Sequence, residues 1–297
     1  MSCQLDRVPQ WTENGRVTLA AAIATPAFDA KPFVKWVGGK RQLLHAIAPH
    51  LTKLKPGGTY HEPFVGGGAV FFHLQPRRAY LTDSNARLVR TYRGIQEDVG
   101  RVIRQLRKYE AEHNKDFYLE LRAQNIDAKK KDADVAAWFI YLNRTGYNGL
   151  YRVNSKNGFN VPFGDYKKPM ICDEDNLRAC AGALEGATVE KADFTAIERR
   201  AERGDFVYFD PPYIPLTATS RFTDYTSEGF ADADQVRLRD VARALKSRGV
   251  TVLLSNSSAQ RVYDLYGKHF ECRKVDARRS VNCNPNGRGR ISELLIY

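Results

Sequence analysis

Long apolar runs are absent from this sequence. No stretch approaches the roughly 18 consecutive apolar residues that a membrane span requires. The Ala-rich segment Leu19–Ala27 faintly resembles the apolar part of a secretory signal, but Asp6 and Glu13 precede it and Pro26 interrupts it. We therefore expect a cytoplasmic protein that has no membrane partner.

Cysteines are few and scattered. The 297 residues contain 5 cysteines, an odd number, and no Cys-x-x-Cys pair occurs among them. This pattern indicates neither a disulfide framework nor a zinc site, so we expect no metal. A reducing compartment fits it best.

A phosphate-binding loop is also missing. Gly38-Gly39-Lys40 resembles one, but the spacing Gly-x-x-x-x-Gly-Lys-Ser/Thr is absent and Arg41 stands where the hydroxyl residue should be. The pattern therefore argues against an ATPase of that class. Trp36 and Lys40 can still contact the ring and the carboxylate of another cofactor.

Positive charge is abundant instead. There are 46 Lys and Arg residues against 34 Asp and Glu, which gives a net charge of +12 and a pI of about 9.5. Such an excess favours a polyanionic partner, most commonly nucleic acid, although a merely basic soluble protein is the alternative. With 43% hydrophobic residues, the chain can form one large or two modest domains.

The segment Val207–Tyr213 is the most informative part of the chain. Phe206–Phe209 has the pattern of a short buried strand, and Pro211 and Pro212 end its hydrogen bonding directly after Asp210. A carboxylate, a rigid backbone and the ring of Tyr213 therefore follow the carboxyl end of a strand, where open α/β sheets bind ligands. Asp210 and a proline carbonyl can accept from a substrate amino group, and Tyr213 can stack on a flat base. An ordinary strand followed by a turn is the alternative.

A glycine-rich loop precedes this segment. Gly66 and Gly68 belong to a run between an expected strand ending near Tyr60 and a helix from Ala69, and they allow close approach of a ligand to the backbone. Glu62 beside the loop suits a cationic cofactor. About 20 residues further on, a second strand ends at Asp83, where an acid can bind ribose hydroxyls. Capping of the next helix is the alternative for Asp83.

A third strand is expected over Thr188–Phe194. Asp193 and Phe194 at its end can hydrogen-bond and sandwich a cofactor adenine. Helix capping is again the alternative for Asp193.

The region between these strands has a different character. We expect charged helices over Val99–Lys115 and Phe117–Gln124 and an apolar helix over Ala133–Leu142. The Lys156-Asn157-Gly158 turn then predicts a β-hairpin within Asn143–Gly164. The hairpin is too polar for a core element, and its side chains suit reading of base edges or wedging between bases. A structural decoration is the alternative.

The order of these motifs resembles the α-group DNA adenine-N6 methyltransferases, and most closely the Dam-type enzymes that methylate GATC. The resemblance covers about Lys31 to Tyr297. It rests on Phe33–Lys40, Glu62–Gly68, Asn143–Gly164, Asp210–Tyr213 and Arg278–Val281.

The resemblance implies roles for individual residues. Asp210, Pro211, Pro212 and Tyr213 match the catalytic tetrad. The cofactor, S-adenosyl-L-methionine, would be held by Trp36, Lys40, Glu62, Phe64, Gly66, Gly68, Asp83, Asp193, Phe194 and Asp210. Tyr147, Asn148, Leu150 and Arg152 match the family positions that enter or read DNA. From their side-chain chemistry alone, we also expect Arg144, Lys156 and Arg288 to contact DNA.

The implied fold is a doubly wound, mixed α/β sheet with an inserted, mainly helical DNA-recognition domain bearing a β-hairpin. We expect an N-terminal extension over 1–30, a discontinuous catalytic domain over 31–85 and 188–297, and a target-recognition domain over 86–187. The implied activity is transfer of a methyl group to N6 of a flipped-out adenine in double-stranded DNA. We expect a nucleoid-associated protein that is a monomer in solution and can bind DNA in more than one copy. A non-catalytic DNA-binding relative, and a methyltransferase acting on RNA or a protein amide, are the alternatives.

Overall fold

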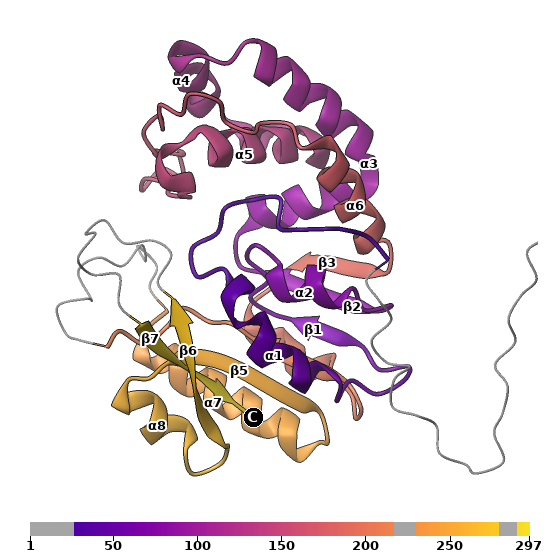
Figure 1. The fold of residues 1–297 in the computed structure, drawn as a ribbon, viewed down its shortest axis with the longest axis vertical. Coiled ribbons are helices and arrows are strands. Elements are labelled where there is room, and N and C mark those ends of the chain that lie inside the picture. The colour runs from indigo at the N-terminus through magenta and orange to yellow at the C-terminus, as the bar shows by residue number, and fades with distance from the viewer. Residues whose placement is uncertain (1–26, 217–229, 279–289) are drawn as a thin grey trace, which may run out of the picture.

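The computed structural model describes residues 27–216, 230–278 and 290–297. Its centre is a seven-stranded mixed sheet (Figure 1). In sheet order the strands are β3 (Ala187–Lys191), β2 (Ala79–Asp83), β1 (Tyr60–Glu62), β4 (Phe206–Phe209), β5 (Thr251–Ser257), β7 (Arg290–Ile296) and β6 (Cys272–Arg278). The first five are parallel, whereas β7 is antiparallel to both of its neighbours.

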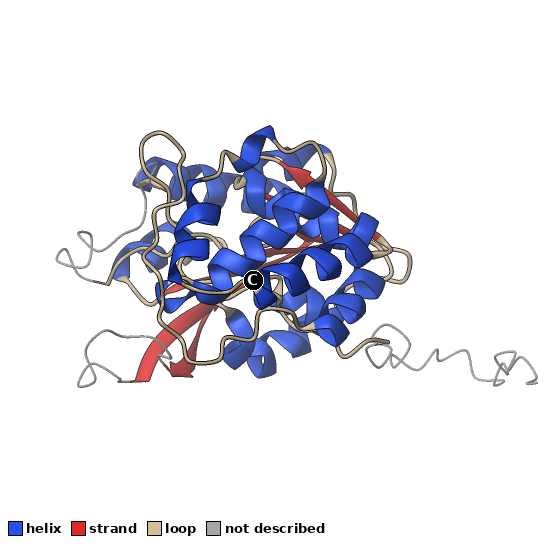
Figure 2. Ribbon diagram, turned by 90° about the horizontal axis from the view of Figure 1, so that it is seen from above, coloured by secondary structure: helices blue, strands red, loops and turns tan. Residues whose placement is uncertain are grey.

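Helices connect and cover the strands. The α-helices are α1 (Leu44–Leu51), α2 (Ala69–Leu74), α3 (Ala86–Ala111), α4 (Lys115–Ala123), α5 (Asp132–Thr145), α6 (Glu174–Leu184), α7 (Asp232–Ser247) and α8 (Gln260–Tyr266). Short 3₁₀ turns are η2 (Lys40–Leu43), η3 (Ile126–Ala128), η4 (Tyr147–Gly149) and η5 (Phe194–Arg199). In the view of Figure 2 the helices hide most of the sheet.

Both faces of the sheet are buried, which explains the continuous apolar sequence of β4. Phe206 and Tyr208 point into a core shared with α1, α2 and α3, while Val207 and Phe209 point into a second core formed with η5, α7 and α8. Successive side chains of a strand alternate between faces, so a strand covered on both sides is apolar throughout. The predicted doubly wound, mixed α/β fold is confirmed.

The helices between β2 and β3 extend beyond the sheet. The long helix α3 is kinked at Asp98 (φ −149°, ψ 62°) and packs along α5. Figure 1 shows α4 and α5 gathered above the sheet, with α6 leading back to β3. The expected helices in this region are confirmed, although the first begins at Ala86 and includes the two segments that flank Asp98.

The apolar start of Pro32–Lys40 suggests a short strand, and this prediction is wrong. Phe33 and Val34 are buried, but they lie in an irregular segment without β pairing. The backbone N–H and C=O of Lys35 bind the side chain of Asn143 instead of a neighbouring strand (2.7 and 2.9 Å). A side-chain amide thus satisfies the peptide groups that a sheet would otherwise satisfy.

Some predictions fall outside the described residues. The sequence suggests a partial helix near Thr18–Ala24, and the Thr- and Ser-rich segment Ile214–Gly229 suggests a flap over the site. The helix, most of the flap and the DNA contact assigned to Arg288 lie outside the described residues. Within the described ranges, no helix combines the length and the apolarity that crossing a membrane requires.

Candidate active site

Acidic residues gather at the carboxyl edge of the parallel strands. Glu62 ends β1, Asp83 ends β2, Asp193 follows β3, and Asp210 follows β4. The chain winds from β1 toward β3 on one side and continues through β4 and β5 on the other, so the winding reverses between β1 and β4. Open α/β sheets bind their ligands at this reversal. The topology therefore places Glu62 and Asp210 on adjacent strands at the expected ligand position.

Asp210 is paired with a buried lysine. Lys40 Nζ lies 2.8 Å from Asp210 Oδ1 and its side chain is 6% exposed. The approach is close enough for an ion pair, but Oδ1 has no hydrogen-bond partner of favourable geometry within the described residues. Burial raises the pKa of Asp210 to about 6, although Lys40 opposes the rise. At neutral pH, Asp210 is therefore ionised, and its carboxylate keeps lone pairs beyond the contact with Lys40.

Hydrogen bonds from α7 and β5 hold the two prolines in place. Gln235 Nε2 donates to the Pro212 carbonyl (2.8 Å), and Asn256 Oδ1 accepts from the Ile214 amide (3.1 Å). Asn256 Nδ2 also donates to Gln235 Oε1 (3.2 Å), which joins the two supports. Among the described residues, no donor binds the Pro211 carbonyl. Two acceptors, Asp210 and Pro211, thus remain available for an amino group.

Tyr213 is anchored at both its face and its hydroxyl. Lys40 Nζ lies 4.8 Å from the centre of its ring, and its hydroxyl donates to Glu293 Oε2 on β7 (2.6 Å). A hydrogen bond to a carboxylate is stronger than one between neutral groups. It also fixes the plane of a ring that has few rotatable bonds.

Glu62 is buried, and its contacts are internal. It is 2% exposed, its carboxylate accepts from the Tyr60 hydroxyl (2.8 Å), and the Phe71 amide in the first turn of α2 also bonds to it. Burial raises the pKa of Glu62 to about 8, with the charge on Asp210 contributing. Glu62 therefore ties the end of β1 to α2 and does not line an open surface.

The glycine loop is compressed against Trp36. A Cβ atom on Gly66 (φ +47°) would lie 2.7 Å from the Trp36 ring, and one on Gly68 (φ +68°) would lie 2.5 Å from the Tyr92 hydroxyl. Asp83 Oδ2 accepts from the Gly66 amide (3.1 Å), and burial raises the pKa of Asp83. Asn85, and not Asp83, caps α3. The capping alternative for Asp83 is therefore wrong, and the ribose contact stays a prediction.

The residues predicted to surround the cofactor adenine are packed against neighbouring side chains in this structure. The Phe64 and Phe194 rings stack directly, with centroids 5.5 Å apart and planes 24° apart. Asp193 caps η5 by accepting from the Thr195 amide (3.0 Å). Arg237 on α7 lies over the Phe194 ring and binds Asp193 Oδ1 (5.1 and 3.2 Å). The capping alternative for Asp193 is thus what the structure shows, and a purine between Phe64 and Phe194 requires the rings to separate.

Some of the predicted DNA contacts at the end of α5 and just after it are exposed, whereas another is bonded within the protein. Tyr147 is 51% exposed, and Asn148 is exposed at φ +53°. Leu150 is half-buried against the core. Arg144 donates from Nε and Nη2 to the Phe33 carbonyl (3.2 and 3.0 Å), and burial lowers the pKa of Arg144. In this structure Arg144 therefore ties α5 to the Phe33 segment.

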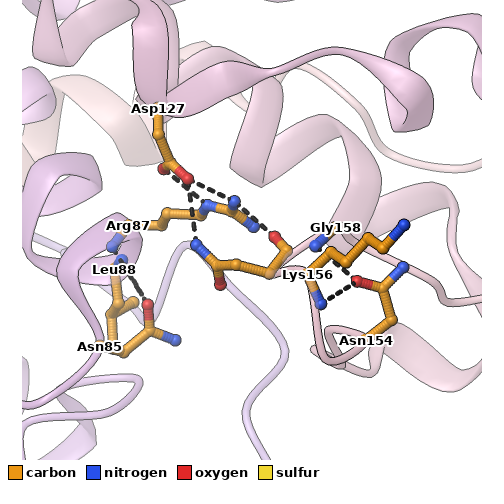
Figure 3. A network of polar contacts seen from close by, with 8 residues as sticks. Asn85, Arg87, Leu88, Asp127, Asn154, Lys156 and Gly158 are labelled. Carbon is orange, nitrogen blue, oxygen red and sulfur yellow. Dashed lines mark hydrogen bonds and ion pairs between the residues drawn. The ribbon is translucent and has the colours of Figure 1, made fainter.

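The hairpin is present but short. One antiparallel bridge pairs Val153 with Phe159, and backbone bonds run from Asn154 N to Gly158 O and from Asn160 N to Arg152 O (2.9 and 3.0 Å). Asn154 Oδ1 accepts from the Lys156 and Gly158 amides, which closes the turn (Figure 3). The Lys156 side chain is exposed.

Arg152 is exposed on the hairpin and held by the opposite strand. It donates from Nε to Asn160 Oδ1 and from Nη2 to the Asn160 carbonyl (2.8 and 3.1 Å). Its Nη1 donors have no partner in the described ranges, so Arg152 retains donors for a base edge.

Sequence reasoning missed the residues that support the site. Asn143 and Asn256 are buried in α5 and β5, Gln235 lies on the buried face of α7, and Glu293 is half-buried on β7. That irregularity in the apolar pattern is the signal by which they could have been found, because a buried polar side chain needs a partner. Their partners are distant in sequence, so the pattern could not identify them.

The comparisons with known proteins agree with this arrangement. The family described as D12 class N6 adenine-specific DNA methyltransferase matches residues 36–281. The type II methyltransferase M1.LlaDCHI of Lactococcus lactis subsp. cremoris is 44% identical over 90% of this chain and 95% of its own. The type II methyltransferase M.MjaIII of Methanocaldococcus jannaschii is 42% identical, over 90% and 99%.

A further relative carries the name DNA adenine methylase. This protein of Escherichia coli K12 is 35% identical over 89% of this chain and 94% of its own. The family match spans the glycine loop, the hairpin and the Asp210–Tyr213 segment alike. The chain therefore belongs to the D12 class of N6 adenine-specific DNA methyltransferases.

Proposed function

We propose that this enzyme uses S-adenosyl-L-methionine to methylate N6 of an adenine flipped out of a GATC site in double-stranded DNA. The observation that carries the proposal is the pair of acceptors at the reversal of the sheet, the Asp210 carboxylate beside Lys40 and the Pro211 carbonyl. GATC is supported by the Dam-type resemblance of the Asn143–Gly164 segment.

The cofactor site is supported by the acids along the carboxyl edge and by the glycine loop. Asp83 keeps lone pairs for a ribose hydroxyl besides those that accept from the Gly66 and Asn85 amides (3.1 and 2.9 Å). Trp36 lies against the loop at Gly66 and Gly67, and Lys40 lies beside Asp210. When bound, the cofactor supplies a methyl group on a positively charged sulfur. This sulfur is a good leaving group, because it becomes a neutral thioether when the methyl group is transferred.

The role of Asp210 and Pro211 follows from the chemistry of adenine. The lone pair on N6 is delocalised into the ring, so the amino group is a poor nucleophile. Two acceptors that bind its two protons localise the lone pair and fix its direction. Gln235 and Asn256 hold the backbone just after the acceptors, at the Pro212 carbonyl and the Ile214 amide, which limits rearrangement of the segment.

Tyr213 offsets part of the cost of extruding the base. Unstacking and unpairing an adenine costs a few kcal/mol. Stacking of a base on an aromatic side chain returns about 1–3 kcal/mol. The Glu293 bond holds the Tyr213 ring ready for this contact.

We assign DNA recognition to residues 86–187. Tyr147, Asn148 and Leu150 would enter or line the site vacated by the base, and Arg152 would bind a guanine edge. Lys156 is exposed for contact with phosphate. Arg144 would have to leave the Phe33 carbonyl to reach DNA, so we expect it to position the segment.

Transfer of tritiated methyl groups tests the proposal. The enzyme should label a duplex with one GATC site and should not label the same duplex with a permuted site or with both adenines already N6-methylated. Label in none of them would contradict the proposal. A non-catalytic relative would bind the duplex without labelling it, and an enzyme for RNA or a protein amide would label those substrates instead.

A further inference from the structure

Arg87 connects the edge of the sheet to the hairpin. It lies in the first turn of α3, four residues after Asp83, and its side chain is 7% exposed. Asn85 between them caps α3 by accepting from the Arg87 and Leu88 amides (3.1 Å each) (Figure 3). The Asn85 cap therefore fixes the backbone at the start of α3.

The Arg87 side chain holds the turn of the hairpin. Its Nε and Nη2 atoms donate to the two carboxylate oxygens of Asp127 (2.8 and 2.6 Å), and Nη2 also donates to the Asn157 carbonyl (2.7 Å) (Figure 3). Asn157 Nδ2 completes the ring of contacts by donating to Asp127 Oδ2 (3.0 Å). Residues from α3, η3 and the turn are thus joined by one bidentate ion pair.

The buried guanidinium depends on this single carboxylate. Asp127 is the one acidic residue that forms an ion pair with Arg87 in the described part of the chain, and Arg87 Nη1 is buried without a hydrogen-bond partner. Arg87 also lies over the Trp138 ring (5.4 Å). Removing one partner of such a pair leaves an uncompensated charge, which the surroundings must then move to accommodate.

The turn that is held this way has little freedom of its own. Asn157 has φ +58°, a backbone conformation that residues other than glycine adopt at a cost. Its backbone carbonyl accepts from Arg87, and its amide side chain donates to Asp127. The turn of the hairpin that carries Arg152 and Lys156 is thus held to α3 and η3 in this DNA-free structure.

We propose that Arg87 and Asp127 are positioning residues that determine the sequence specificity of methylation by holding the hairpin turn in its DNA-reading position. This inference rests on the proposed role of the hairpin in recognition. A pre-ordered reader loses less conformational entropy on its correct site, and it cannot rearrange to suit an incorrect one. Loosening the turn should therefore reduce discrimination between sites more than it reduces binding to DNA in general.

Asp127→Asn tests the proposal most directly, because Asp127 is partly exposed and the change preserves its shape. Asp134→Asn is the matched control. Asp134 forms an equivalent bidentate pair with Arg101 between α5 and α3 (2.7 and 3.1 Å) and does not touch the hairpin. Asn157→Gly is a milder second variant, since glycine tolerates φ +58° and keeps the carbonyl that Arg87 binds.

The measurement is kcat/KM for methyl transfer to GATC duplexes and to duplexes with one altered base pair. We expect Asp127→Asn to lower the ratio of kcat/KM on GATC duplexes to kcat/KM on altered duplexes about tenfold. Asn157→Gly should lower it less, and Asp134→Asn should leave it unchanged. Cofactor affinity should stay within about twofold of wild type in all three, because the cofactor edge is untouched. Equal losses on all sequences, or equal losses in the control, would overturn the proposal.

Arg152→Ala separates failure of this inference from failure of the proposed recognition role. If Arg152→Ala relaxes specificity at one base pair and Asp127→Asn does not change the ratio, the hairpin reads DNA but the Arg87–Asp127 pair does not position it. If Arg152→Ala has no effect on specificity either, the hairpin is not the reader, and the inference falls with that role.

Discussion

At the scale of single residues, the Lys40–Asp210 pair sets the protonation of the acceptor. Asp210 has a pKa raised to about 6, and Lys40 is the main influence that opposes the rise. Only the ionised carboxylate offers both oxygens as acceptors, so methyl transfer should fail as pH falls through this value. Lys40→Met removes the opposing charge. We expect the acidic limb of log kcat against pH to move to higher pH in Lys40→Met.

The measurement is kcat at saturating cofactor and DNA, because Lys40 is also assigned to the cofactor site. An acidic limb that stays in place in Lys40→Met would show that Asp210 is not the group that titrates.

Glu62 gives a second prediction at this scale, which concerns stability. Burial raises its pKa to about 8 from an ordinary 4.5, so the folded state binds the proton more tightly than the unfolded state. This contribution to the free energy of unfolding is fully present below about pH 4.5 and is lost as pH rises to about 8. Glu62→Gln cannot ionise and should lack this loss.

Urea unfolding at pH 5 and at pH 8.5 checks this expectation. The wild type should lose more stability than Glu62→Gln between the two pH values. Parallel losses in both proteins would mean that Glu62 is ionised throughout and that the bond from Tyr60 compensates for its burial.

At the scale of elements, β7 supplies an anchor to the Asp210–Tyr213 segment. Glu293 on β7 accepts from the Tyr213 hydroxyl, and β7 is fixed by pairing with β5 and β6. Because the bond orients the stacking ring, Glu293→Gln and Tyr213→Phe should lower kcat by similar factors, each about tenfold. The double variant should be no worse than either single variant, since both remove the same contact.

A fluorescent 2-aminopurine in place of the target adenine gives an independent measure of stacking. Both single variants should leave the extruded base brighter than the wild type does. Losses of kcat that multiply in the double variant would indicate that the two residues act separately.

The strands and the irregular segments also show which parts of the structure could be predicted from the sequence. The strands with their acidic ends were predictable because apolar runs and the residues that end them lie together in the chain, as in Phe206–Asp210. The irregular Phe33–Lys40 segment was not, because its shape depends on Asn143, more than 100 residues away. The same reason explains why the position of Arg144 was not predicted. Its positive charge suggested a contact with DNA, but its guanidinium donates to the Phe33 carbonyl.

At the scale of the whole molecule, the charge of +12 should make DNA binding strongly dependent on salt. Each phosphate contact releases counterions and adds to the slope of log K against log salt concentration. Lys156→Ala should weaken binding equally on all sequences and reduce that slope by about 1. Titrations of a labelled duplex between 50 and 200 mM salt measure it, with a duplex lacking GATC as the control.

A loss confined to GATC duplexes, with the slope unchanged, would indicate that Lys156 contacts a base and not phosphate.

The most direct test of the account is a structure of the enzyme with a GATC duplex and a non-reactive analogue of S-adenosyl-L-methionine. The account predicts an extruded adenine whose N6 lies within hydrogen-bonding distance, about 3 Å, of Asp210 and of the Pro211 carbonyl, with its ring on Tyr213. An adenine that remains in the duplex, or a corner at Asp210–Tyr213 filled by packed side chains with no room for a purine, would contradict it.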